Sequence, residues 1–220
     1  AYIAFVDADD VLDPDMYTYL TGLLKTYKAQ IATCSGWYKY DSGVEKRFES
    51  PRNVVCLNGR EALGVLHERC YLRAYVWNKL FRREVLDGIR FSTELSFAED
   101  YEMFCRVLEQ CGRIVCGTKT KYYYMQRKSG VCNCGYDRTY QKAMMMFEDY
   151  CRMYSRRYPQ YKKLFENHYL FDLMGMAAAM SRNGNYVAAD CRKIKKYVRQ
   201  KLPQYLMDKK VSLHLKGSAC

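Results

Sequence analysis

The chain opens with an apolar run, residues 2–6, that leads directly into a cluster of acids, residues 7–10. An apolar run without alternation predicts a strand buried on both faces, as in a parallel sheet covered by helices. Asp13 is a good N-cap and Pro14 suits the first helical position, so a helix to about residue 28 should follow. The opening therefore predicts a strand, an acidic turn and a helix.

The same patterns predict further elements along the chain. Apolar or alternating segments bounded by turn residues predict strands, and apolar residues three and four apart predict helices. Asp41-Ser42-Gly43 is a plausible hairpin turn, and beyond Tyr136 the pattern is helical only. The predicted strands are residues 31–34, 37–40, 44–48, 74–81, 113–116 and 121–127, and the predicted helices are residues 58–68, 83–86, 96–111, 137–157, 161–182 and 185–201.

The composition is that of an ordinary globular chain. With 220 residues, 49% of them apolar and 15% aromatic, one domain or one domain with an appendage can bury a sizeable core. Eleven cysteines are scattered without a C-x-x-C pair, which argues against a zinc ribbon and against a disulfide framework. The apolar stretch of residues 170–180 contains Asp172 and is too short to span a bilayer. We therefore expect reduced thiols in a cytoplasmic protein.

The net charge of +12 is unevenly distributed. Residues 1–136 hold 19 Lys and Arg against 17 Asp and Glu, whereas residues 137–220 hold 17 against 7, a net +10. A basic segment attracts anionic lipid surfaces, nucleic acid or acidic partners, although a solvated helix face explains the charge equally well. We expect peripheral contact of the basic helices with an anionic membrane, and no nucleic-acid partner.

The acidic cluster after the first predicted strand carries the candidate chemistry. In an extended segment the carboxylates of Asp7 and Asp9 point to the same side, so both can serve one ligand. Ligands of parallel sheets bind beyond the carboxyl ends of the strands. Carboxylates placed together there, Asp10 included, repel one another unless a cation or a hydrogen-bonding ligand uses them. The cluster therefore predicts a hard-metal site that holds a phosphate-bearing substrate.

One alternative concerns the segment VDADDVL, which resembles the first motif of haloacid-dehalogenase-like phosphatases. That resemblance would make Asp7 a phosphorylated nucleophile. The phosphatase family usually continues with Gly-Thr, where this chain has Asp10-Val11. Moreover, no persuasive combination of a Lys with paired Asp residues follows in the right order.

Five short motifs follow one another along the chain: FVDADDVLDPDMYTYL, VWNKLFRREVL, IRF, FAEDYEMFCRVL and YYYMQRKSG. Each is weak alone, but their order and spacing are specific. Over about residues 1–131 the succession resembles the C-terminal two-thirds of a family 2 glycosyltransferase domain of the bacterial polysaccharide-building type. The resemblance implies a GT-A fold, with a nucleotide-binding α/β half and an acceptor-binding half that carries a Glu-Asp motif.

The resemblance also implies roles for the matching residues. Asp9, together with Asp7, would bind a Mn²⁺ or Mg²⁺ ion that bridges the diphosphate of a nucleotide-sugar. Asp100 would be the general base that deprotonates the acceptor hydroxyl in an inverting transfer, which needs a carboxylate opposite the leaving nucleotide. The other implied contacts are Asp7 with the ribose or base-proximal part of the nucleotide, Asp10 in support of the nucleotide-sugar site, Arg127 with the diphosphate, and Glu99, Trp77 and Lys79 with the acceptor.

Some of these residues also have purely structural interpretations. Glu99 and Asp100 would stand in the first turn of a helix, where acids are favoured by the helix dipole. Trp77 is equally consistent with a core position. The three tyrosines at positions 122–124 are expected to pack as a strand rather than to form a sugar platform.

We therefore expect an α/β fold, with an incomplete GT-A domain over residues 1–136 and a basic α-helical extension over residues 137–220. The expected function is metal-dependent, inverting transfer of a sugar from a nucleotide-sugar to a saccharide or lipid-linked acceptor, in the cytoplasm or at the inner face of the cell membrane. Because the metal motif stands at the first residues, the family's opening segment is expected to be missing and the 220-residue piece inactive alone. The phosphatase and a non-catalytic interaction remnant are the alternatives.

Overall fold

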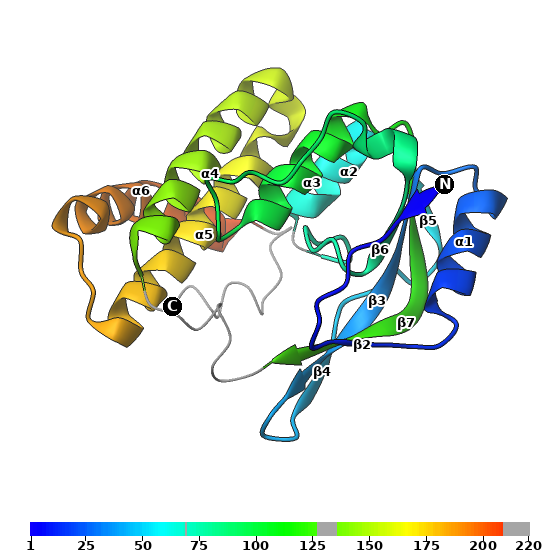
Figure 1. Cartoon of the computed structure of the whole chain (residues 1–220). Helices are drawn as coiled ribbons and strands as arrows, with labels where there is room; N and C mark the ends of the chain where they lie inside the picture. Colours follow the sequence, from blue (N-terminus) through cyan, green and yellow to red (C-terminus); the bar gives the residue numbers. More distant parts are fainter. Residues whose placement is uncertain (69, 127–135, 209–220) are drawn as a thin grey trace. The chain divides into compact units, whose positions relative to one another are not determined.

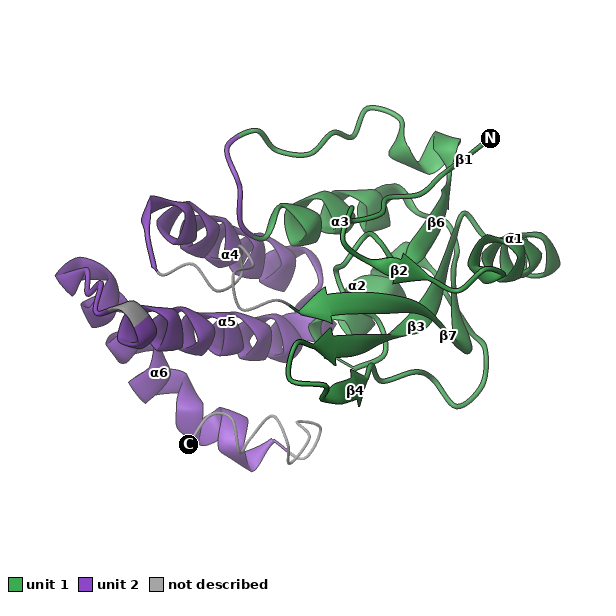
Figure 2. Cartoon of the chain, turned by 60° about the horizontal axis from the view of Figure 1, so that its bottom comes forward, with its two compact units in different colours: residues 1–93, 98–130 green, residues 94–97, 131–220 purple. Residues whose placement is uncertain are grey.

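The chain forms two compact units, coloured separately in Figure 2. The sheet unit comprises residues 1–93 and 98–130, and the helical unit comprises residues 94–97 and 131–220. The predicted boundary after residue 136 stays a prediction. The computed structural model describes residues 1–68, 70–126 and 136–208.

The sheet unit is built around one mixed sheet of seven strands (Figure 1). Two of the strands are long and the others contain two to four residues each. The strands are β1 (Tyr2–Ile3), β2 (Val11–Leu12), β3 (Ile31–Tyr40), β4 (Glu45–Arg47), β5 (Val55–Leu57), β6 (Lys79–Arg82) and β7 (Ile114–Gln126).

The strand order is β1-β6-β3-β7-β2, with β4 paired to β3 and β5 paired to β7. β3 and β7 run parallel, from Ile31 opposite Ile114 to Tyr40 opposite Gln126, and the remaining pairings are antiparallel. The sequence predicted two short strands in place of each long one. The register shifts near Ser35, and such an irregularity interrupts the pattern of a strand without ending it.

The predicted hairpin between β3 and β4 is confirmed. Trp37 lies opposite Arg47, and the intervening turn is closed by a hydrogen bond from the Gly43 backbone N–H to the Tyr40 carbonyl, 2.9 Å long. Gly43 has a φ of 79°, a left-handed conformation that glycine adopts without a steric cost.

The prediction that residues 2–6 form a strand buried on both faces of a parallel sheet is wrong. β1 pairs antiparallel to β6, with Tyr2 opposite Arg82. It stands at the end of the strand order, so within the described chain it has a strand neighbour on one side only. Tyr2 is 40% exposed and Val6 is 47% exposed. An apolar run therefore did not distinguish a central strand from an edge strand.

Three helices flank the sheet, α1 (Met16–Thr26) on one side and α2 (Gly59–His67) and α3 (Glu99–Gln110) on the other (Figures 1 and 2). The predicted cap of α2 is confirmed, because the Asn58 side chain accepts from the Glu61 N–H at 3.0 Å and the Glu61 carboxylate accepts from the Asn58 N–H at 2.8 Å. The short 3₁₀ helix η1 (Arg83–Leu86) also lies where the sequence placed it.

Several predicted elements begin later than expected, including the first helix, the strand predicted over residues 74–81, α3 and α6 (Ala188–Met207). The first helix begins at Met16 rather than directly after Asp13, whose carbonyl instead accepts from the Met16 N–H in a turn. The strand predicted over residues 74–81 is confined to β6, and the preceding Asn78 donates its side-chain amide to the Cys34 carbonyl at 2.6 Å.

The core beside α1 holds the two long strands in place. Met16, Leu20 and Leu24 are fully buried on one face of α1, in the same apolar cluster as Ala32 of β3 and Val115 of β7. Burying a leucine or methionine side chain stabilises a fold by roughly 1.5–3 kcal/mol. β3 and β7 are thus a rigid base for the turn that carries the acidic cluster.

The helical unit confirms the predicted succession of three long helices. Asp137 caps the first of them, accepting from the Thr139 N–H at 2.8 Å, and Gly184, with a φ of 68°, follows the second. Within the described ranges, no helix is long and apolar enough to cross a membrane. The helices are α4 (Arg138–Arg157), α5 (Lys162–Asn183) and α6 (Ala188–Met207), with the 3₁₀ helix η3 (Pro159–Tyr161) between the first two.

Candidate functional site

The acidic turn lies between β1 and β2 and is attached to the sheet at its far end. The Asp10 N–H donates to the Asp7 carbonyl at 3.1 Å, which closes the turn. β2 then pairs with β7, with Leu12 opposite Tyr122. The pairing places residues 7–10 beside the second half of β7, although the two segments are more than a hundred residues apart in the sequence.

Asp10 is the structural member of the acidic cluster. One of its carboxylate oxygens accepts from the Tyr122 hydroxyl at 2.5 Å, and the other accepts from the Met125 N–H at 2.8 Å. Burial raises the pKa of Asp10, while these two hydrogen bonds act in the opposite direction. Because both oxygens already have protein donors, Asp10 fixes the turn to β7 and supports the site indirectly.

Asp7 and Asp9 remain exposed at the turn. Burial raises the pKa of Asp7, and the negative charges of Asp9 and Glu99 raise it further. Glu99 belongs to α3, so the fold brings the D-x-D pair and the Glu-Asp pair into electrostatic contact. This arrangement favours a bound cation, which would relieve the repulsion.

The Glu-Asp pair begins α3 directly after a residue with an unusual backbone conformation. Ala98 has a φ of 63°, and a left-handed backbone is uncommon for residues other than glycine. Such conformations cost of order 1–3 kcal/mol and cluster at functional sites. The backbone of Ala98 is therefore a second unusual feature at the start of α3, beside the Glu-Asp pair.

Asp100 is the most strongly perturbed carboxyl group of the cluster. Burial raises its pKa to about 7, and the negative charges of Glu99 and Asp7 act in the same direction. The Val76 N–H and the ammonium of Lys79 oppose that shift. A carboxyl group with a pKa near neutrality is suited to take a proton from a substrate hydroxyl at physiological pH.

Lys79 is completely buried and interacts electrostatically with Asp100. Its ammonium donates to the Arg73 carbonyl at 2.9 Å, to the Asn78 side-chain oxygen at 2.8 Å and to the Tyr75 carbonyl. Burial lowers the pKa of Lys79 to about 7. Three acceptors match the three protons of an ammonium group, which favours the charged form.

Trp77 is also buried, with 3% of its surface exposed. Its ring stacks on those of Tyr75, Tyr122 and Tyr124, with centroid distances of 4.8, 4.2 and 5.2 Å. Trp77 and Lys79 thus have almost no accessible surface, and their predicted contacts with an acceptor stay a prediction. The aromatic stack packs against the ring of Tyr122, whose hydroxyl donates to Asp10.

The site thus contains most of the predicted residues and two that the sequence did not reveal. Asp7, Asp9, Asp10, Glu99 and Asp100 come together, whereas Arg127 lies outside the described residues. Tyr122 was expected only to pack in a strand, and no sequence pattern links it to Asp10. The backbone of Ala98 gave no sequence signal either, because no glycine marks it.

A divalent metal ion fits the exposed part of this cluster. Two carboxylates on one turn supply hard oxygen ligands, and a diphosphate and waters can complete the six positions that Mg²⁺ or Mn²⁺ prefers. The described residues contain no group of three His, Cys, Asp or Glu side chains placed to hold a metal by themselves. Metal binding here would therefore depend on a ligand that brings further oxygens.

The chain resembles known proteins in sequence and in fold. No family model matches the chain. Over 190 residues, or 84% of its length, the chain is 27% identical to a protein of Bacillus subtilis (strain 168) described as "Uncharacterized glycosyltransferase EpsJ". The match covers 50% of that relative, so the chain spans about half its length.

The solved structure of S. aureus TarS 1–349 in complex with UDP-GlcNAc shares the fold. It superposes with a TM-score of 0.53 at 14% identity, over 99% of this chain and 59% of the other. The predicted fold class, a GT-A-like mixed α/β sheet with helices, is confirmed. The chain is thus similar in sequence to a protein described as a glycosyltransferase, and it shares the fold of TarS.

Proposed function

We propose that this chain carries the catalytic carboxylates of a glycosyltransferase that moves a sugar from a nucleotide-sugar to a saccharide or lipid-linked acceptor. The observation that carries the proposal is the approach of the Glu99-Asp100 pair to the D-x-D turn, with the pKa of Asp100 raised to about 7. The similarity to a described glycosyltransferase and the fold shared with a UDP-GlcNAc complex support a nucleotide-sugar as the donor.

In the proposed reaction Asp100 acts as the general base. Its carboxylate takes the proton of the acceptor hydroxyl, while the acceptor oxygen forms a bond to the anomeric carbon of the donor sugar. The bond from that carbon to the nucleoside diphosphate breaks, and the diphosphate leaves with the bonding electron pair. Attack opposite the leaving group inverts the anomeric centre, which is the stereochemical outcome we propose.

Asp7 and Asp9 would hold a Mn²⁺ or Mg²⁺ ion against the diphosphate. A divalent cation there supplies charge neutralisation for the departing diphosphate, worth several kcal/mol in the transition state. Asp10 and Tyr122 keep the turn in place for that role. The negative charge of Glu99 adds to burial in raising the pKa of Asp100, and a contact of Glu99 with the acceptor is part of the proposal.

The alternative phosphatase hypothesis has less support. It would place Asp7 at the end of a strand in a parallel sheet, but β1 pairs antiparallel to β6. The sequence and fold similarities are to glycosyltransferases as well. A cytoplasmic location, which the scattered cysteines predicted, remains a proposal.

A binding experiment on the natural protein that contains this sequence tests the site. Calorimetric titration with UDP and with GDP, each with and without Mn²⁺, should show binding that depends on the metal. Asp7→Asn and Asp9→Asn should each weaken it at least tenfold, whereas Asp15→Asn, an exposed acid outside the cluster, should not. Metal-independent binding, or equal binding by all three variants, would contradict the proposed site.

A further inference from the structure

The last helix of the chain has two faces of different character. α6 carries six Lys and Arg residues, and they divide between a face directed at α4 and α5 and a face directed outward. The division decides which of the charges are available to a partner.

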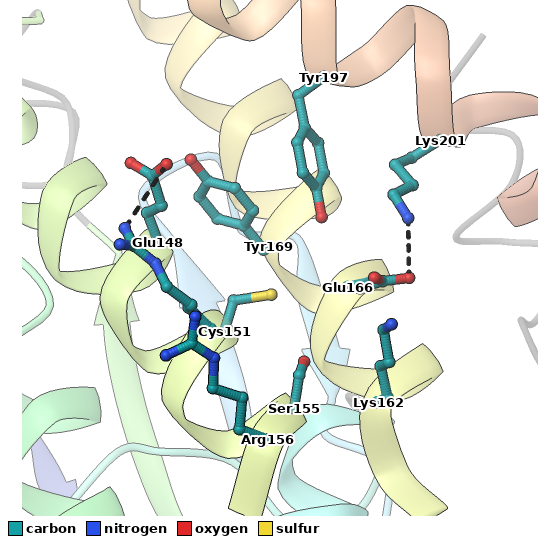
Figure 3. A pocket seen from close by; sticks show the side chains of 10 residues that line it. Glu148, Cys151, Ser155, Arg156, Lys162, Glu166, Tyr169, Tyr197 and Lys201 are labelled. Carbon is teal, nitrogen blue, oxygen red and sulfur yellow. Dashed lines mark ion pairs between the residues drawn. The ribbon is translucent and has the colours of Figure 1, made fainter. Parts of the chain in front are cut away.

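The inward face of α6 is packed and electrically neutralised. Ile194 and Tyr205 are buried. Lys193 forms an ion pair with Glu148 of α4, and Lys201 pairs with Glu166 of α5 at 3.0 Å. Figure 3 shows Lys201 reaching Glu166 at the edge of the cleft between these helices, which has a volume of about 340 Å³.

The outward face keeps its positive charges. Arg192, Lys195, Lys196 and Arg199 are exposed and follow the i, i+3, i+4, i+7 spacing of one helix face. They line a shallow hollow of about 530 Å³ together with Gln200. Within the described parts of the chain none of the four forms an ion pair.

The same face ends in apolar side chains. Leu206 and Met207 stand seven and eight positions after Arg199, and they are 36% and 81% exposed. The outward face of α6 is therefore cationic over residues 192–199 and apolar at residues 206 and 207. Helices that lie in a membrane interface combine these two features.

We propose that the outward face of α6 docks on the surface of an anionic lipid bilayer. The four cations would bind lipid phosphate and carboxylate groups, and Leu206 and Met207 would enter the boundary between headgroups and acyl chains. The proposal goes beyond sugar transfer and does not depend on it. Single-stranded nucleic acid fits this face less well, because the described residues that line the hollow include no aromatic ring for bases to stack on.

Vesicle flotation of the full 220-residue chain tests the proposal. Vesicles of phosphatidylcholine with phosphatidylglycerol should carry the protein, and vesicles of phosphatidylcholine alone should not. Substitution of all four cations of the face by Gln should lower the partition coefficient roughly 100-fold or more, since each basic residue contributes separately to attraction by anionic lipid. Added salt should weaken binding in the same direction.

A matched control separates the position of the charges from their number. The variant K25Q/K46Q/R52Q/R83Q removes four exposed cations from the sheet unit and should bind like the unsubstituted chain. The variant L206S/M207S keeps every charge and should lose binding that persists at high salt. Circular dichroism verifies that each variant is folded.

Three results would overturn the proposal: no binding to anionic vesicles, equal loss in the two four-charge variants, or tighter binding to a single-stranded RNA than to anionic vesicles.

Discussion

Asp100 should make the stability of the sheet unit depend on pH in a predictable way. Burial raises its folded-state pKa to about 7 from the ordinary value of 3.8. The folded protein therefore holds a proton that the unfolded chain gives up above pH 4. This contribution to stability is complete below pH 4 and is lost as the pH rises toward 7. Asp100→Asn removes the titration and keeps an oxygen that can accept from the Val76 N–H.

The magnitude follows from the two pKa values. A difference of about three pKa units corresponds to roughly 4 kcal/mol over the whole range, at 1.36 kcal/mol per unit. Between pH 5 and pH 8 the loss should be roughly 2–3 kcal/mol. The difference in unfolding free energy between Asp100→Asn and the unsubstituted chain should therefore rise by about that amount from pH 5 to pH 8.

Urea denaturation at pH 5 and at pH 8 measures this difference. Both tryptophans of the chain, Trp37 and Trp77, belong to the sheet unit, so their fluorescence reports that unit without the helical one. Asp87→Asn, at an exposed position of the same unit, is the matched control and should follow the unsubstituted chain at both pH values.

The reasoning is refuted if Asp100→Asn and Asp87→Asn show the same change in unfolding free energy between pH 5 and pH 8. That result would mean that Asp100 is ionised in the folded protein at pH 5, and that its surroundings do not retain the proton.

Two further predictions concern the rest of the sheet unit. Tyr122→Phe removes a hydrogen bond to the Asp10 carboxylate and should lower the unfolding free energy by roughly 1.5–3 kcal/mol, measured by the same fluorescence assay. An unchanged unfolding free energy would mean that the Tyr122 hydroxyl does not hold the turn. Gly59→Ala would place a Cβ 1.9 Å from the Leu108 carbonyl oxygen and should lower the unfolding free energy by roughly 1–3 kcal/mol or more. Gly22→Ala, with open space around it, is the control and should not lower the unfolding free energy. Equal losses in the two variants would disprove the close approach of α2 and α3.

Local features of the fold could be predicted from the sequence because they depend on neighbouring residues. The capping box of Asn58 and Glu61, the hairpin turn at Gly43 and the three long helices after Tyr136 all follow from spacings of a few positions. The acidic cluster and the Glu-Asp pair were also found, because each is contiguous in the chain and both belong to one ordered series of motifs.

Long-range features could not be predicted in the same way. The edge position of β1 depends on which strands surround it, and an apolar run carries no information about that. The burial of Trp77 and Lys79 follows from an aromatic stack and a set of carbonyl acceptors that only the folded chain assembles. The bond between Asp10 and Tyr122 joins residues 112 positions apart.

The central claim is that Asp100 is the base of a sugar transfer, and its most direct test is transfer by the natural protein that contains this sequence. Release of nucleoside diphosphate would be measured from a panel of nucleotide-sugars, with Mn²⁺ and with saccharide and lipid-linked acceptors present. We predict that Asp100→Asn lowers the rate by a factor of about 10²–10⁴. We also predict that the rate of the unsubstituted protein rises with pH through about 7, as Asp100 ionises. Equal rates for the two proteins, or no release from any donor by the unsubstituted protein, would contradict the account.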